Sequence, residues 1–391
     1  MKIFLITPHF APEVGGIEHH VLNLAYGLSE RHQVKVITCG KNNGWNAHTP
    51  FEVVRLPYIT PPAYPYETLS NFKIPNIGAH FSEVLRDDTP DVVHIHGHHY
   101  PISWFAATSF RNTPLALTLH GMYALNPNRP RGKTFLEEVF NKTIFSFLLQ
   151  RVDAVIGLTP TITNYARQYS CDETRFYSIP NGIDLELYQR SLRERMRYRL
   201  EYEMPSDKNV VLFIGRFSRA KGVLELAVAI RSILRQRKDV IFMLAGGGPN
   251  ESLLRAMLKG LEEAKFVGWL PHRNIHKLEI AADVLVMPSK WEALPITMIE
   301  GIAAQMHIVT TPVGGIVDIL KNYKNKTYID GFTATSVALA LNKALGNLPR
   351  KEAKSVPDFA RLFDWDNIVR KIEGVYRAIV QFNEGRSVLH A

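Results

Sequence analysis

The chain has 391 residues, of which 46% are hydrophobic and 21% charged, and its formal net charge at pH 7 is +9. This composition excludes a disordered or fibrous protein, and the length suffices for two ordinary globular domains. The only cysteines, Cys39 and Cys171, exclude a disulfide framework and a thiolate metal site. Because so few cysteines are typical of a reducing compartment, we expect a cytoplasmic protein.

Short apolar runs alternate with longer stretches of helical spacing, and this alternation runs through the chain twice. The first series of expected strands covers 3–7, 34–38, 92–96, 115–120 and 154–158, with an amphipathic helix over 17–30. The second series covers 210–214, 240–245, 284–287 and 308–311, with helices over 223–237, 251–261 and 298–304. Such βα alternation predicts an α/β fold with two doubly wound, Rossmann-like domains. We place them at 1–190 and 205–362, with the seam within 185–207.

Three segments stand apart from this alternation. The first is a terminal helix within 363–391, for which the sequence leaves open whether it crosses back to the first domain. The second, 60–75, is rich in proline and aromatic residues without a clear period, which is typical of a functional loop. The third is arginine-rich, and we interpret it as a solvated helix face rather than a lipid or nucleic-acid site; its members are Arg190, Arg193, Arg195, Arg197 and Arg199.

No stretch approaches the roughly 18 apolar residues of a membrane span, so any membrane association would be peripheral, at the inner face. Residues 126–151 combine basic and aromatic side chains at a spacing that fits an apolar helix face on an anionic bilayer. A core helix behind a polar loop explains the same pattern. The residues concerned are Arg129, Arg131, Lys133, Phe135, Phe140 and Phe145.

In the first domain, Gly15 and Gly16 lie where the first βα loop enters a helix, a place that can hold an anion or be no more than a tight turn. Histidines follow at the ends of two later strands. Those in VVHIHGHH could ligate zinc, but no carboxylate or thiolate is in register, so we predict no metal site there. They are His94, His96, His98 and His99. His120, which precedes Gly121 at a strand end, is the better candidate for the active site.

The second domain carries two charged motifs. FIGRFSRAKGV places Arg216 and Lys221 on the loop after its first strand, where fixed cations would neutralise a diphosphate and replace a divalent metal. KWEALPITMIEG places Glu292 on a loop and Glu300 in the following helix, where carboxylates accept hydrogen bonds from vicinal hydroxyls. Solvated surface charges are the alternative. An Asp-x-Asp match in FDWDN is discounted as a metal motif because aspartate commonly caps a helix.

Taken together, these motifs resemble the retaining glycosyltransferases of family 4. The resemblance covers nearly the whole chain and depends on the glycine pair, TLHG, IPNGID, GRFSRAKG, AGGGP, PSKWEALPITMIEG and TTPVGG. It implies a GT-B fold, with two facing domains and the active site in the cleft between them. It also implies that Gly15 and Gly16 approach the donor phosphates, that His120 contacts the transferred sugar, and that Arg216 and Lys221 bind the diphosphate.

For the segment after residue 288, the resemblance implies that Glu292 holds sugar hydroxyls and Glu300 the ribose diol. The main-chain amides around Leu294 and Ile296 would support the phosphates, although Pro295 stands where the family often has glycine and removes one amide donor.

The expected activity is a retaining, metal-independent transfer of a hexose from a UDP- or GDP-sugar to a hydroxyl of a saccharide or lipid-linked acceptor. The sequence predicts His120, Glu292, Arg216 and Lys221 as catalytic residues, no cofactor beyond the nucleotide-sugar substrate, and no nucleic-acid partner. Acceptor contacts are expected from 60–75 and 122–133. The alternatives are a nucleotide-sugar epimerase and a non-catalytic binding protein on the same fold, since fold does not fix function.

Overall fold

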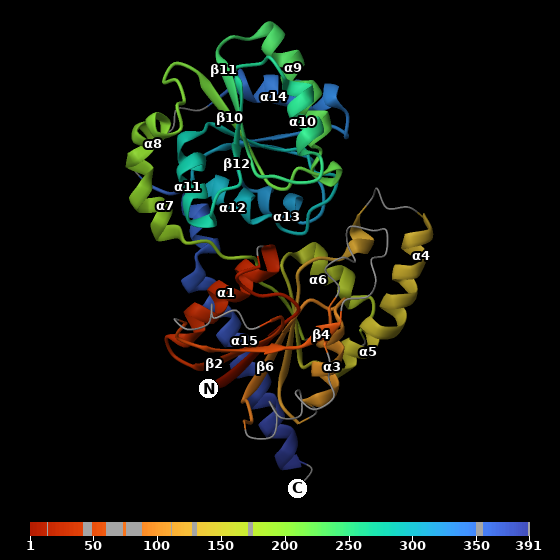
Figure 1. Ribbon diagram of the computed structural model, residues 1–391. Helices are drawn as coiled ribbons and strands as arrows, with labels where there is room; N and C mark the ends of the chain where they lie inside the picture. The colour runs from red at the N-terminus through yellow and green to blue at the C-terminus, as the bar shows by residue number, and fades with distance from the viewer. Residues whose placement is uncertain are drawn as a thin grey trace. The chain divides into compact units, whose positions relative to one another are not determined.

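The computed structural model describes residues 1–13, 15–41, 49–59, 73–75, 88–110, 112–126, 131–170, 175–348 and 355–389. Most of the predicted loop over 60–75, together with Arg129 and Cys171, lies outside these residues. The chain forms two compact units (Figure 1). One comprises Met1–Leu125, Arg129–Gly182 and Trp365–Ala391, and the other is essentially Ile183–Asp364.

The first unit is built on a seven-stranded parallel sheet in the order β3-β2-β1-β6-β7-β8-β9. Its central strands are buried along almost their whole length, as expected when helices cover both faces. The strands are β1 (Lys2–Thr7), β2 (Gln33–Cys39), β3 (Glu52–Leu56), β6 (Val92–His96), β7 (Leu115–Leu119), β8 (Ala154–Gly157) and β9 (Phe176–Ser178), and β4 (Tyr58–Ile59) pairs separately with β5 (Ile74–Pro75). The helices are α1 (Gly16–Ser29), α3 (Pro101–Ser109), α4 (Arg131–Phe140), a π-helical stretch (Asn141–Phe145), α5 (Ser146–Arg151) and α6 (Pro160–Arg167).

The terminal helix α15 (Trp365–Leu389) belongs to the first unit. It packs beside α1, and its apolar face enters the core under β1 through Ile368, Ile372 and Tyr376 (Figure 1). The hydroxyl of Tyr376 lies 2.6 Å from Nδ1 of His94, a buried histidine of β6. The chain leaves the first unit after Gly182, which is earlier than the expected seam within 185–207. It returns to this unit at Trp365, two residues after the expected start of the terminal segment at 363.

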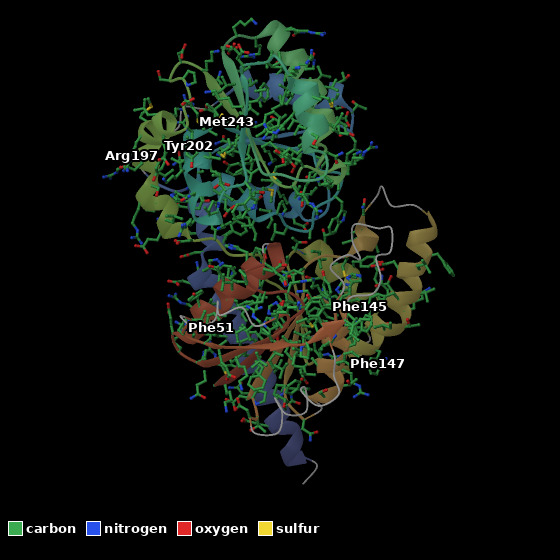
Figure 2. All side chains as sticks on the ribbon, in the orientation of Figure 1. Phe51, Phe145, Phe147, Arg197, Tyr202 and Met243 are labelled. Atoms are coloured by element: carbon green, nitrogen blue, oxygen red, sulfur yellow. The ribbon has the colours of Figure 1, made fainter. Side chains whose placement is uncertain are left out.

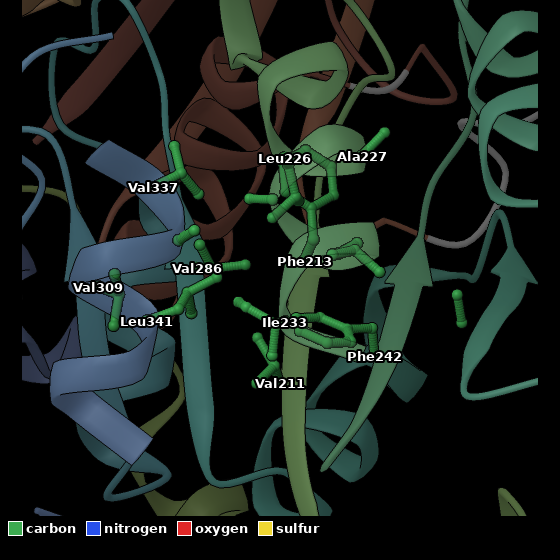
Figure 3. Packing of buried hydrophobic residues seen from close by; sticks show 14 of the residues in the cluster. Val211, Phe213, Leu226, Ala227, Ile233, Phe242, Val286, Val309, Val337 and Leu341 are labelled. Carbon is green, nitrogen blue, oxygen red and sulfur yellow. The ribbon is translucent and has the colours of Figure 1, made fainter. Parts of the chain in front are cut away.

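The second unit contains a six-stranded parallel sheet in the order β12-β11-β10-β13-β14-β15. These strands are β10 (Asn209–Ile214), β11 (Val240–Ala245), β12 (Ala264–Gly268), β13 (Val284–Met287), β14 (His307–Thr310) and β15 (Lys326–Tyr328). Its helices are α7 (Leu185–Ser191), α8 (Arg195–Glu201), α9 (Val223–Gln236), α10 (Glu251–Leu258), α11 (His272–Ala281), α12 (Ile296–Ala303), α13 (Ile316–Leu320) and α14 (Ala334–Leu345). Helices α9 and α14 pack side by side on the sheet, where Phe213, Ile233 and Leu341 meet in one apolar cluster (Figure 3).

The interpretation of the arginine-rich segment as a solvated helix face is wrong for two of its residues. Arg195 and Arg199, one turn apart on α8, both form ion pairs of 2.6 Å with Asp283, and Arg199 is only 5% exposed. Asp283 also accepts a hydrogen bond of 2.8 Å from the main-chain nitrogen of Val210 in β10. Arg197, on the opposite side of the helix, does extend into solvent (Figure 2).

In the part of the chain that the structure describes, no helix is both long and apolar enough to cross a membrane.

Replacing Asp283 with alanine should therefore lower the free energy of unfolding by about 3–5 kcal/mol, because two largely buried guanidinium groups lose their counter-ion. The matched control is Glu186→Ala, which breaks a solvent-exposed pair with Arg190 and should cost less than about 1 kcal/mol. Urea denaturation of both variants provides the comparison. Equal effects of the two substitutions would contradict a structural role for Asp283.

Candidate active site

The charged motifs of the second unit meet where the strand order of its sheet reverses. From β10 the chain first adds β11 and β12 on one side, and then returns to place β13 on the other side of β10. The loops that follow β10 and β13 therefore lie side by side at the carboxyl ends of these strands, the usual ligand position in open α/β sheets. Arg216 lies two residues after the end of β10 and is exposed, with no ion-pair partner among the described residues, while Lys221 ends a short 3₁₀ turn (Arg219–Lys221).

Glu292 is joined to the first of these loops by an ion pair. Its Oε1 accepts hydrogen bonds from Nζ of Lys221 at 2.5 Å and from Oγ of Ser289 at 2.7 Å, and the residue is 7% exposed. Both bonds go to the same oxygen, so the carboxylate is held in one orientation while its other oxygen can accept from a ligand. The sequence predicted Lys221 and Glu292 as separate site residues and did not predict that they contact each other.

Glu300 lies in the second turn of α12, as predicted, and is 3% exposed. Its Oε1 lies 2.8 Å from Nε2 of His272, the first residue of α11. Although burial works against the charged imidazole, the hydrogen bond and negative charge of Glu300 raise the pKa of His272 above its usual value. The other carboxylate oxygen is buried without a hydrogen-bond partner among the described residues. Because an unsatisfied buried acceptor is costly, this oxygen marks a place for a hydroxyl donor.

Two glycines allow the loops of this site to approach each other. Gly222 and Gly314 have φ of 68° and 54°, a left-handed conformation that favours glycine. A Cβ at Gly314 would lie 1.7 Å from the carbonyl oxygen of Glu292, and one at Gly222 would lie 2.1 Å from that of Pro288. The main chain around Glu292 therefore depends on the absence of side chains on its neighbours.

The other residues that the sequence predicts to contact the nucleotide-sugar donor lie at the N-termini of two helices. Leu294 is buried, and Ile296 is the first residue of α12, preceded by Pro295 in an extended conformation. In the first unit, Gly15 precedes α1 and Gly16 begins it, after the carboxyl end of β1. Strand order reverses between β1 and β6 in this sheet as well, so both glycines lie beside its switch point.

His120 follows β7 and belongs to a cluster of three histidines. Its Nε2 lies 3.1 Å from Nδ1 of His96, and its ring centroid lies 5.0 Å from that of His20, a residue of α1. Burial lowers the pKa of His20 to about 4, and burial with neighbouring imidazoles holds the pKa values of His96 and His120 well below their usual range. All three are therefore neutral at pH 7. The sequence analysis missed His20, whose only signal is its position one turn after Gly16.

The other predicted histidines have partners elsewhere. His94 hydrogen-bonds Thr118 at 2.7 Å besides Tyr376, and His99 pairs with Glu137 at 3.1 Å. His98 is buried against the ring of Phe145. Of the four histidines in VVHIHGHH, the structure thus brings only His96 into one cluster with His120.

Comparison with known proteins agrees with this architecture. The model of Glycosyltransferase Family 4 matches residues 14–187, and that of Glycosyl transferases group 1 matches residues 193–356. The GPI3 subunit of phosphatidylinositol N-acetylglucosaminyltransferase from Saccharomyces cerevisiae is 24% identical over 97% of this chain and 83% of its own length.

Two solved structures have the same fold. Sucrose-phosphate synthase from Thermosynechococcus elongatus has a TM-score of 0.76 at 20% identity, over 97% of this chain and 98% of its own. Anabaena HepE in complex with UDP and glucose has a TM-score of 0.70 at 19% identity, over 96% and 98%. The two parallel-sheet domains define a protein of GT-B architecture. The chain belongs to the family 4 type of glycosyltransferases and is a glycosyltransferase enzyme.

Replacing Gly314 with alanine should lower the free energy of unfolding by about 2 kcal/mol or more, because a left-handed backbone and a carbonyl overlap must both be accommodated. Gly374→Ala is the control, since a Cβ at this helical position meets no described atom within 4 Å and should be neutral or stabilising by up to about 1 kcal/mol. Thermal unfolding distinguishes the two. A Gly314→Ala variant as stable as the parent would show that the Glu292 loop moves freely.

Proposed function

We propose that the protein transfers a hexose from a nucleoside-diphosphate sugar to a hydroxyl of an acceptor, with retention of anomeric configuration and without a metal ion. The observation that carries this proposal is the placement of Arg216 and Lys221 after β10 and of Glu292 and Glu300 after β13, on both sides of one switch point. Cations suit a diphosphate and carboxylates suit the hydroxyls of the sugars on its two ends.

The cations act on the leaving group. Arg216 offers an exposed guanidinium with a rigid fork of N–H groups. Lys221 offers a single ammonium, which forms an ion pair with Glu292. Negative charge grows on the diphosphate as its bond to the sugar breaks, so fixed donors at this position stabilise the transition state more than the ground state. Each well-placed donor contributes about 3 kcal/mol. Amides at the start of α12, around Ile296, support the same charge.

The carboxylates position the two sugars of the donor. The Oε2 of Glu300, which has no hydrogen-bond partner among the described residues, is suited to a ribose hydroxyl, and Glu292 to hydroxyls of the transferred hexose. The presence of UDP and glucose in the HepE structure supports a nucleotide-linked hexose as donor. The active site in a cleft between the domains stays a prediction.

The chemistry is a same-face substitution. The bond between the anomeric carbon and the diphosphate oxygen breaks, the acceptor oxygen bonds to the same face of that carbon, and the acceptor proton passes to the leaving diphosphate. His120 contacts the sugar as a neutral group, in accordance with its lowered pKa. Such a neutral imidazole orients a hydroxyl without adding positive charge beside an oxocarbenium-like carbon.

An epimerase or a non-catalytic nucleotide-sugar binder on the same fold would make different products. The test is to incubate the enzyme with a panel of UDP- and GDP-hexoses, with and without saccharide and lipid-linked acceptors. A transferase releases nucleoside diphosphate in an acceptor-dependent manner and forms a product heavier by one hexose. Isomerised donor without released diphosphate would establish the epimerase, and tight donor binding with no turnover would establish the binder.

Arg216→Ala and Lys221→Ala should each lower kcat about a hundredfold or more while the protein stays folded, because each removes a donor to the leaving diphosphate. Arg219→Ala is the matched control, since this exposed arginine lies on the same 3₁₀ turn and should stay within about threefold of the parent. Near-normal turnover in both test variants would reject the diphosphate assignment.

Activity should persist in excess chelator, because the cation pair takes the place of a divalent metal. Asp364 and Asp366 do not belong to a cluster of three potential metal ligands among the described residues. Asp366→Asn should therefore leave turnover unchanged. The measurement is initial rate in EDTA against EDTA with excess magnesium or manganese. If the initial rate is lost in EDTA and either metal restores it, the proposed metal independence is contradicted.

A lipid-linked acceptor would bring the enzyme to a membrane surface, and the name of the yeast GPI3 relative, which includes phosphatidylinositol, supports such an acceptor. The expected apolar face needs correction, because Phe145 is fully buried and Phe140 stacks on His99. The exposed apolar side chains near it are Phe135, Leu136, Val139 and Phe147. Figure 2 shows Phe145 inside the unit and Phe147 at its edge. We propose that this corrected face makes a weak, peripheral contact with anionic lipid.

Vesicles that contain anionic lipid should bind the protein at low salt and release it at high salt, since attraction to surface cations is screened. Replacing both Phe135 and Leu136 with serine should reduce binding severalfold, because apolar insertion is lost. Leu339→Ser removes a similarly exposed leucine from α14 and should have no effect. If the parent does not cosediment with the vesicles even at low salt, the membrane contact is contradicted and a soluble acceptor is favoured.

A further inference from the structure

Three histidines from distant parts of the sequence converge in the first unit. His20 comes from α1, His96 ends β6 and His120 follows β7. Each offers a ring nitrogen, and the three nitrogens lie within 4.8 Å of one another. His20 and His96 are 1% and 0% exposed, so the cluster is not a chance gathering of surface side chains.

Among the described residues, one buried ring nitrogen of His20 and one of His96 have no hydrogen-bond partner. Nδ1 of His20 lies 3.0 Å from Oδ1 of Asn181, and donation to that oxygen places the lone pair on Nε2. Nε2 of His20 is buried and has no hydrogen-bond partner among the described residues. An imidazole with one nitrogen bonded to an oxygen acceptor and the other unpartnered is the arrangement of histidines that ligate metal ions.

The spacing also suits an ion. Two imidazoles on one tetrahedral zinc, each about 2.0–2.1 Å from the metal, have their nitrogens roughly 3.3 Å apart. Nδ1 of His96 and Nε2 of His120 are already 3.1 Å apart, so a metal would replace the proton that they share. A ring nitrogen of His20 lies within 4.8 Å of the other two ligand atoms and would complete a three-histidine set, with the fourth position left for water or substrate.

The other cluster of three potential ligands among the described residues is less suitable. It contains His9, Glu13 and Glu18. The carboxylate of Glu13 already pairs with Lys73 and with His9, and its side chain is 42% exposed. A competing ammonium and solvent access both weaken metal binding there.

We propose that His20, His96 and His120 form a site for a divalent transition metal of the zinc type, and that occupancy of this site inhibits the enzyme. The metal is a regulator here rather than a cofactor. Binding itself follows from the histidine geometry alone. The inhibition rests on the proposed function, because it arises when the metal engages His120 and prevents this residue from contacting the transferred sugar.

Metal binding is measured on tag-free full-length protein that has been stripped with chelator, with no donor or acceptor present. Equilibrium dialysis against zinc should show one ion per chain at a site that His20→Asn and His96→Asn each weaken by more than about tenfold. His99→Asn is the matched control, because this histidine is close in sequence but outside the cluster, and its affinity should equal that of the parent. Circular dichroism and thermal unfolding verify that each variant is folded.

Cobalt absorption provides a second readout that needs no variant. Intense visible bands indicate a tetrahedral nitrogen site and support the proposal, whereas weak bands of an octahedral ion overturn it. Absence of stoichiometric zinc, or equal affinity in the parent and His20→Asn, also overturns it. If zinc binds and turnover does not fall, the proposed inhibition is contradicted and the proposed metal site is supported. If zinc binds and no transferase activity is found at all, the proposed function fails and the metal site does not.

Discussion

Asp283 joins the two halves of the second sheet at the end opposite to the site. This one carboxylate accepts a hydrogen bond from Val210 in β10, pairs with Arg195 and Arg199 of α8, and immediately precedes β13. Strands β10 and β13 are the two that the reversal of strand order brings together. Because they are not consecutive in the chain, their adjacency needs contacts of this long-range kind. The ion pair between Lys221 and Glu292 bridges the loops at the other ends of the same two strands, so the stability of this strand pair and the geometry of the site are coupled.

Periodicity predicted the strands and the class of fold because a parallel sheet buried on both faces requires continuous apolar runs. The turn residue Pro295, rather than periodicity, indicated that Glu300 lies one to two turns into the helix that follows, and the structure has it in the second turn. The contacts that orient the site were not predictable in this way. His272 reaches Glu300 from the start of another helix, and His20 reaches His120 from α1. In both cases only the tertiary fold brings the two residues together, and no spacing in the sequence records it.

Arg199 and Gln305 show two further limits of local reasoning. A run of arginines is ordinarily solvated. Arg199 is buried instead because it pairs with Asp283, which is 84 positions away in the sequence. Gln305 has φ of 60°, a conformation that favours glycine, and its side-chain amide donates to the carbonyl of Ser355 at 2.6 Å. This hydrogen bond, made by a distant segment, offsets part of the cost of about 1–2 kcal/mol of a left-handed residue with a Cβ. The residue type of Gln305 alone favours a backbone with negative φ at this position.

The two units supply opposite electrostatic environments for the proposed reaction. In the second unit, side chains of opposite charge pair with each other, as Lys221 does with Glu292 and His272 does with Glu300. In the first unit, burial keeps His20, His96 and His120 neutral. A neutral cluster is compatible with an oxocarbenium-like carbon, which a nearby cation would destabilise. The same neutrality leaves lone pairs available for a metal ion, whose two positive charges would then oppose the reaction. One physical property, desolvation of the imidazoles, thus favours both the proposed chemistry and its inhibition by zinc.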